Sequence, residues 1–384
     1  MNATFQSASL KQRLRPIFAG FDGWLLVAIF WLAALGLMNM YSAGYDNGAR
    51  FGDHSRNMVI GFTLLLAVSQ LPPQRLMQLA VPLYTVGVTL LVAVILFGIS
   101  KKGAKRWLNV GVVIQPSEIM KLAMPLMLAW WFQKREGMLR TLDFAVAGIL
   151  LALPGLMVQK QPDLGTAILV VSSGVYVLFF AGLRYRWIVP FMVAGAIGAI
   201  ALIHYEPQIC KKEVSWPLLK EYQKDRVCTL LDPTKDRKGN GFHVIQGKIA
   251  IGSGGITGKG LMQGTQTHLE FIPERTTDFA FAAFAEENGL LGCLALLAGF
   301  SLLIFRGLMI AAHAPTVFSR LMAGAVSMSL FTYVFVNMGM VSGILPVVGV
   351  PLPFISYGGT AMVTLGLQLG ILMSIARSRR LMQS

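Results

Sequence analysis

Residues 75–98 read RLMQLAVPLYTVGVTLLVAVILFG, and after Arg75 the run carries no charged side chain. A helix of 24 residues is about 36 Å long, enough to cross the roughly 30 Å of hydrocarbon in a bilayer. We therefore predict an all-α polytopic membrane protein with ten transmembrane helices. The ten apolar runs lie at about 22–41, 57–72, 75–98, 116–133, 142–158, 164–183, 187–204, 279–304, 321–345 and 358–376.

The composition agrees with this fold class. Hydrophobic residues make up 55% of the 384, charged residues only 13%, and the mean hydropathy is +0.62. A soluble domain carries about 25% charged residues, so this chain cannot cover a globule with polar surface. The net charge of +15 could indicate nucleic acid, but Lys and Arg favour the segments that a cytoplasmic N-terminus places inside. We expect one membrane domain over 1–384, both termini cytoplasmic, no cleavable signal peptide and no nucleic-acid partner.

One long loop, 205–278, follows the seventh run and is expected outside the membrane. A loop of this length inside a compact fold is usually functional. Its glycines between Gly252 and Gly260 resemble a phosphate-binding loop. However, Ser253 stands where the first glycine of GxxxxGK[ST] belongs, and Gly260 where the final Ser or Thr belongs. We expect no nucleotide site there.

Two shorter outside segments differ from ordinary connectors. Residues 101–116 read KKGAKRWLNVGVVIQP, and 345–357 read LPVVGVPLPFISY. Three prolines in thirteen residues rule out a regular helix in the second segment. Its apolarity predicts a broken or re-entrant segment that other parts of the protein cover, or that lines a cavity.

Ionisable residues at the outer ends of the helices are candidates for function, because such groups are costly in a membrane. Glu118 and Lys121 lie three residues apart and share a helix face. They either form a mutual ion pair that holds the helix end, or Lys121 binds an anionic ligand and Glu118 orients it.

Two aspartates precede helices. Asp163 and Asp278 could each simply cap a helix and favour its positive end. Glu286 and Glu287 lie further along the helix that follows Asp278, on different sides of it. We expect at least one of these two glutamates to be buried among helices.

Basic residues stand beside Trp107 on the outside. Lys101, Lys102, Lys105 and Arg106 are either interfacial anchors, with Trp107 at the headgroups, or a receptor for phosphate or pyrophosphate. Together with the carboxylates, they predict a membrane-embedded site that opens outward.

Six motifs in a fixed order are similar to those of the shape, elongation, division and sporulation (SEDS) family, over nearly the whole chain. The motifs at 337–350 resemble its rod-elongation branch, RodA, rather than the division branch, FtsW. A His often precedes the family's Asp where this chain has Thr277, and the Cys-bearing segment around 206–240 also departs from the pattern. The six are NMYSAG (39–44), KRWLNVGVVIQPSEIMKLA (105–123), QPDLGTA (161–167), AIGSGGITGKGLMQGTQ (250–266), IPERTTDFAFAAFAEENGLLG (272–292) and PVVGVPLPFISYGGTA (346–361).

The resemblance implies a ten-helix SEDS fold with a GT-C-like likeness and a large periplasmic loop. It also implies an inner-membrane glycosyltransferase that polymerises lipid II, works with a class B penicillin-binding protein (a PBP2-type transpeptidase) and uses Asp278 as its essential acid. Asp278 would be the general base, with inversion at the anomeric carbon. Lys121, with Arg106 as a helper, would hold the diphosphate. Glu118 and Asp163 would orient those groups or a divalent cation, Mg or Mn, although the sequence requires no cofactor. The remaining substrate-binding candidates are Lys105, Trp107, Gln115 and Ser117.

Two other functions remain open: a lipid flippase, which also needs a charged amphipathic cavity, and a non-catalytic scaffold for a synthase. A disulfide is predicted as well. Cys210 and Cys228 both lie in the outside loop, and the envelope of a Gram-negative cell is oxidising.

Overall fold

A computed structural model describes residues 20–46, 48–101, 104–109, 111, 113–137, 139–210, 214, 216, 221–236, 239–269, 271–272 and 274–383. Each of the ten predicted spans coincides with a long helix. These ten are α2 (Gly23–Ala43), α3 (Gly48–Ser69), α5 (Ala80–Phe97), α6 (Pro116–Gln133), α7 (Thr141–Lys160), α8 (Leu164–Phe180), α9 (Tyr185–Ile209), α13 (Ala280–Ala312), α14 (Val317–Val341) and α15 (Gly359–Gln383).

Among the described residues, seven helices are long and apolar enough to cross a membrane, and α8 is a shorter apolar helix. The other two, α3 and α6, carry polar and charged residues near their N-termini, among them Arg50, Asp53, Glu118 and Lys121. α3 also begins nine residues before the predicted run, because that polar first part is helical too. The chain is a multi-pass membrane protein.

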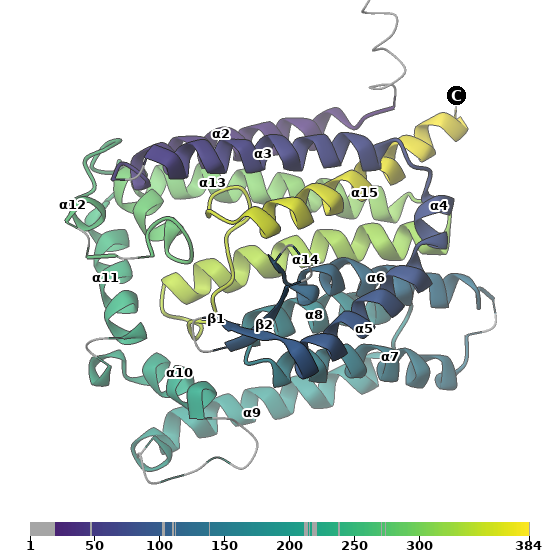
Figure 1. Ribbon diagram of the computed structural model, residues 1–384, viewed down its shortest axis with the longest axis horizontal. Coiled ribbons are helices and arrows are strands. Elements are labelled where there is room, and N and C mark those ends of the chain that lie inside the picture. Colours follow the sequence, from purple (N-terminus) through teal and green to yellow (C-terminus); the bar gives the residue numbers. More distant parts are fainter. Residues whose placement is uncertain are drawn as a thin grey trace, which may run out of the picture.

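The loops between helices gather mainly at one end of the bundle (Figure 1). There lie α10 (Glu221–Leu231), the 3₁₀ turn η1 (Pro233–Lys235), α11 (Asn240–Ser253) and α12 (Thr265–His268). We call this the loop end. At the opposite end, the short helix α4 (Pro73–Gln78) connects α3 to α5. Both the start of α2 and the end of α15 lie there as well, since a Cβ on Gly20 would meet Arg377 at 3.0 Å.

The segment 99–114 forms a small antiparallel sheet, which the sequence pattern did not predict. Strand β2 (Ala104–Asn109) pairs with β1 (Ile99–Lys101) on one side and with β3 (Val113–Ile114) on the other. Successive side chains of a strand point to opposite faces. Lys105 and Trp107 therefore share one face of β2, and Arg106 the other.

The helices differ greatly in burial. In the apolar stretch of α14, 78% of the residues are buried inside the protein, whereas in that of α9 none are. Figure 1 shows α14 within the bundle and α9 along its edge, next to α10. The protein core therefore forms around α14, whereas the apolar side chains of α9 face away from the bundle.

The glycine-rich segment of the loop docks on α13 through its backbone. α13 is broken at Gly289, where φ is 59° and ψ is −162°. The amide N–H groups of Leu290 and Leu291 donate to Gly255 O at 2.9 Å and Ile256 O at 3.1 Å. A Cβ at Gly258 would lie 2.1 Å from Glu287 O. These glycines permit a close backbone approach between the loop and α13.

Candidate functional site

The end of α8 that faces the loop end is held by Asp163. One carboxylate oxygen accepts from the N–H of Thr166 at 3.2 Å, as a helix cap does. The other accepts from Nε2 of Gln115 at 2.9 Å and lies 3.7 Å from Nη1 of Arg106. Gln115 also donates to Ser117 Oγ at 3.2 Å. Asp163 is thus both a cap and the carboxylate that joins β2, α6 and α8.

Glu118 and Lys121 form the ion pair that their spacing predicts. Lys121 Nζ lies 2.7 Å from Glu118 Oε1, and the two side chains are only 4% and 15% exposed. Thr364 of α15 donates to Glu118 Oε2 at 3.2 Å, and Lys121 Nζ lies 5.4 Å from the centre of the Tyr333 ring of α14. The pair therefore stands where α6, α14 and α15 meet.

Asp278 lies in the turn before α13, and its backbone is fixed independently of its carboxylate. Asn337 of α14 donates through Nδ2 to Asp278 O at 3.0 Å and to Val350 O at 2.7 Å. Gly349 lies beside the carboxylate, because a Cβ there would be 3.4 Å from Asp278 Oδ2. Asn337 thus joins the turn that carries Asp278 to the proline-rich segment 345–357.

That segment is non-helical, as predicted, and covers the end of the bundle. Tyr357 N–H donates to Thr276 O at 2.7 Å, and His54 Nε2 lies 3.1 Å from Phe354 O. Between this segment and α15 lies a small apolar cleft, lined by residues that include Tyr333, Leu352, Met362 and Leu365. Since Tyr333 also contacts Lys121, the cleft adjoins the charged pair.

Sequence reasoning missed Tyr222 and Arg226 on α10. The Arg226 guanidinium lies 5.8 Å from the centre of the Tyr222 ring. Burial lowers the pKa of Arg226; Arg106 acts in the same direction, whereas Asp163 and Asp278 act to raise it. Burial likewise raises the pKa of Tyr222. The charges of Arg106, Asp163 and Asp278 thus all act on the pKa of Arg226. In the sequence, only its positive charge marks Arg226. It lies in the long loop, and the positive-inside rule does not count charges in long loops.

Some predicted site residues lie apart from the charged cluster, by which we mean Arg106, Glu118, Lys121, Asp163 and Asp278. Lys105 turns to the end of α5, where Nζ donates to Ile95 O at 2.9 Å and Leu96 O at 3.2 Å. Trp107 shares that face of β2, away from Arg106. Lys102 lies outside the described residues, and so does the side chain of Lys101.

Glu286 and Glu287 are both buried, as expected for at least one of them, but neither joins the cluster. Glu286 accepts from the backbone N–H groups of Gln266 and Thr267, at 2.8 and 3.1 Å, and pairs with Lys259 Nζ at 2.6 Å. Glu287 accepts from Ser42 Oγ at 2.5 Å. These glutamates anchor the loop 259–268 to α13.

Among the described residues, no group of three His, Cys, Asp or Glu side chains could hold a metal ion. The carboxylates of Asp163 and Glu118 instead have cations and hydrogen-bond donors as partners. The site thus gathers carboxylates, guanidiniums and one buried ammonium beside an apolar cleft, which suits an amphipathic anionic ligand.

Comparison with known proteins agrees with the family resemblance seen in the sequence. The family model described as "Cell cycle protein", which covers FtsW, RodA and SpoVE, matches residues 23–381. The chain belongs to the FtsW/RodA/SpoVE family. It is 45% identical over 363 residues to the peptidoglycan glycosyltransferase MrdB of Escherichia coli K12, covering 94% of this chain and 95% of MrdB. It is 36% identical to MrdB of Helicobacter pylori J99, covering 83% and 81%.

Two solved structures of this family share the fold. The rod shape determining protein RodA of Thermus thermophilus is 28% identical, with a TM-score of 0.69 over 94% of this chain and 97% of that one. A chain from work on the structural coordination of polymerization and crosslinking by a peptidoglycan synthase complex is 32% identical, with a TM-score of 0.75 over 94% and 98%. The predicted SEDS fold and its rod-elongation branch are confirmed.

Proposed function

We propose that this chain is a peptidoglycan glycosyltransferase that polymerises lipid II into glycan strands on the periplasmic side of the bacterial inner membrane during cell elongation. The observation that carries the proposal is the 45% identity, over 94% of the chain, to a protein named for this activity. The charged residues at the loop end support the roles proposed below.

The proposed reaction is one displacement at the anomeric carbon of the donor sugar. A hydroxyl oxygen of the acceptor sugar forms the new bond to that carbon, and the bond from the carbon to the phosphate oxygen breaks. Its electron pair leaves with the lipid diphosphate, while the hydroxyl proton goes to the carboxylate of Asp278. We propose inversion of configuration, because no covalent intermediate is needed.

The cations would carry the charge that develops on the leaving diphosphate. Lys121 is nearly buried, and Arg106 keeps a buried Nε that has no hydrogen-bond partner within the described residues. Glu118 and Asp163 position these two cations.

No step of this mechanism requires a divalent cation. Asp163 already accepts hydrogen bonds on both oxygens, and Glu118 has Lys121 and Thr364 as partners. These residues therefore do not form a ready metal site. Polymerisation measured with and without a chelator tests whether the reaction needs Mg or Mn.

We also propose a class B penicillin-binding protein as partner. Support comes from the similarity to a chain of a synthase complex that couples polymerization with crosslinking. A transpeptidase that crosslinks new strands needs them on its own side of the membrane, which agrees with a periplasmic loop end.

The test is to incubate the purified chain with lipid II and to separate the products by size. Glycan polymer is expected. Movement of lipid II across vesicle membranes without polymer would favour a flippase. Neither activity, together with tight binding to the synthase, would favour a scaffold.

A further inference from the structure

A stretch of three residues in the proline-rich segment touches both sides of the candidate site. On one side, a Cβ on Gly165 would lie 2.6 Å from Val348 O, and Gly165 stands two residues after Asp163 in the first turn of α8. On the other side, a Cβ on Gly349 would lie 3.4 Å from Asp278 Oδ2. Three residues span at most about 7 Å between their outer Cα atoms. This stretch therefore sets how far Asp278 stands from the helix that Asp163 caps.

One side chain holds the stretch to the turn that carries Asp278. Asn337 of α14 is fully buried, and its Nδ2 donates to Val350 O at 2.7 Å and to Asp278 O at 3.0 Å. A second contact with the same helix follows at the start of the stretch, where the N–H of Val348 donates to Met340 Sδ at 3.3 Å. The most buried helix of the bundle thus fixes both backbones.

Gly349 brings the backbone of the segment against the carboxylate. Its φ of +73° lies in the left-handed region, which glycine adopts without strain and other residues do not. Any other residue there would also place a side-chain carbon 3.4 Å from Asp278 Oδ2. The glycine thus permits a close approach that a side chain would disturb.

We propose that Asn337 and Gly349 are positioning residues for Asp278. Through the three-residue stretch they hold its carboxylate at a fixed separation from Asp163 and Arg106, so that one substrate meets the base and the cation together. Both act through Asp278 and not on the reacting atoms. This inference rests on the proposed function, because it takes Asp278 as the general base.

The experiment measures kcat and KM for polymerisation of lipid II by the purified full chain, with thermal unfolding of the same preparations. Asn337→Leu keeps the approximate size of the side chain but removes its donor. It should lower kcat about 100-fold, the effect of a misplacement of about 1 Å. KM should remain nearly unchanged, because the cations that hold the diphosphate keep their own partners.

Asn39→Leu is the matched control for this change. Asn39 is buried on α2, and its Nδ2 donates at 3.4 Å to Ala280 O, two residues beyond Asp278. The variant loses a buried amide contact with the same region but leaves the proline-rich segment in place. It should lower the melting temperature and keep kcat.

Gly349→Ala tests the inference without Asn337, and decides alone if Asn337→Leu does not fold. It should lower kcat about tenfold or more, again with little change in KM. Gly182→Ala is its control, because Gly182 has a φ of +101° and open space around a Cβ, and it follows the far end of α8. That variant has the same kind of backbone strain and should keep kcat.

A kcat equal to that of the unaltered chain in both Asn337→Leu and Gly349→Ala would overturn the inference. So would an equal fall in kcat in Asn39→Leu, which would trace the loss to a general loosening of the turn, or a rise in KM with kcat unchanged. The proposed function fails on a different result: if the unaltered chain makes no polymer, that function is wrong and this inference fails with it.

Discussion

Asn337 of α14 holds the backbone of Asp278, because its Nδ2 donates to the Asp278 carbonyl oxygen at 3.0 Å. Asp278→Asn should therefore leave the fold and the binding of the partner synthase intact. Polymerisation should fall by about 10²-fold to 10⁴-fold, the usual contribution of a general base. The measurement is polymer yield from lipid II, with thermal unfolding as a check on folding.

Asp225→Asn is the matched control for this change, because it removes an exposed carboxylate from α10. Its polymer yield should equal that of the unaltered chain. Near-normal polymer from Asp278→Asn would remove Asp278 from the role of base.

Lys121 either holds the helix end by pairing with Glu118 or binds the substrate diphosphate. The 2.7 Å distance between Lys121 Nζ and Glu118 Oε1 fits both interpretations. Lys121→Met leaves Glu118 as a buried charge without its partner, which costs about 3 to 5 kcal/mol, and should also abolish polymerisation. The double variant Lys121→Met/Glu118→Gln removes both charges and should recover most of the thermal stability. It should not recover lipid II binding or activity if Lys121 contacts the diphosphate.

Recovery of activity in the double variant would show that the pair only holds the helix end. Thermal unfolding and lipid II binding, measured on the same preparations, separate the two cases.

The candidate site was predictable in part from single residues. Glu118, Lys121, Asp163 and Arg106 stood out because charges at membrane helix ends are costly. Lys105 could not be separated from Arg106, because only the pairing of β2 decides which face each side chain takes. Arg226 could not be found at all, since the charges that act on its pKa come together only where the long loop folds back.

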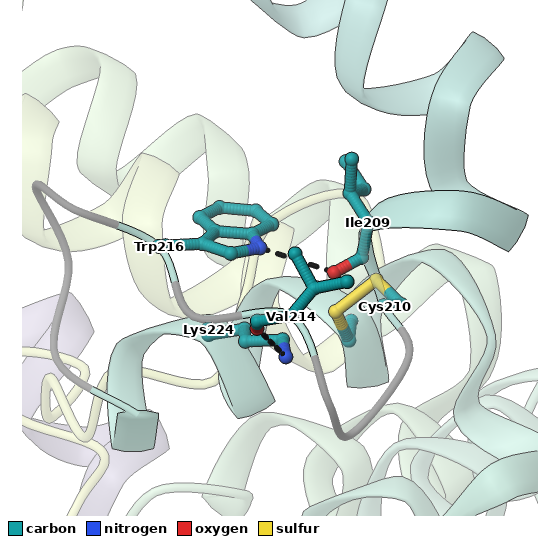
Figure 2. Close-up of a disulfide and its surroundings, with 6 residues drawn as sticks. Ile209, Cys210, Val214, Trp216 and Lys224 are labelled. Carbon is teal, nitrogen blue, oxygen red and sulfur yellow. Dashed lines mark hydrogen bonds between the residues drawn. A yellow bond between two sulfur atoms is a disulfide. The ribbon is translucent and has the colours of Figure 1, made fainter.

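At the scale of elements, the disulfide predicted between Cys210 and Cys228 is present and connects α10 to α9 (Figure 2). Closing an 18-residue segment stabilises it by about 3 kcal/mol in the chain-entropy model. Cys210→Ser should loosen α10 and raise KM for lipid II, while polymerisation persists because Asp278 and Lys121 lie on other elements. Alkylation before and after reduction, read by mass spectrometry, should label Cys210 and Cys228 only after reduction.

Cys293, which is a free thiol in α13, provides the internal control for labelling. Labelling of both loop cysteines without reductant would contradict the crosslink. An unchanged KM in Cys210→Ser would show that the disulfide does not position α10 for substrate binding.

Glu286 is the anchor of the loop 259–268, with a side chain that is 0% exposed. Glu286→Gln weakens hydrogen bonds from the N–H groups of Gln266 and Thr267 and leaves Lys259 without its counter-ion. We expect a loss of about 2 kcal/mol in the free energy of unfolding. A double-mutant cycle with Lys259→Met, followed by thermal unfolding, measures the coupling; additive effects would show that the ion pair contributes nothing.

The helices were predictable because a membrane span is a local property of about twenty residues. Which helices and loops pack together was not predictable, because contacts such as that of α13 with the glycine-rich loop join distant parts of the chain. The sheet of β1 to β3 escaped prediction for a similar reason: its strands are only two to six residues long and show no clear alternation.

At the scale of the whole molecule, the burial of α14 and the exposure of α9 divide the bundle into a fixed part and a lipid-facing part. α2, α13, α14 and α15 are held by side-chain packing. α9 lacks such packing within the described residues, and its end is crosslinked to α10.

With little packing to hold it, α9 should adjust its tilt to the thickness of the bilayer, between the limits that its interfacial Tyr185 and Trp187 allow. Its 25 residues measure about 38 Å along the axis, so a thinner bilayer makes it lean and a thicker one draws it upright. Either movement reaches α10 through the crosslink. The acyl-chain length of the surrounding lipids should thus shift α10 along the membrane normal through the Cys210–Cys228 crosslink.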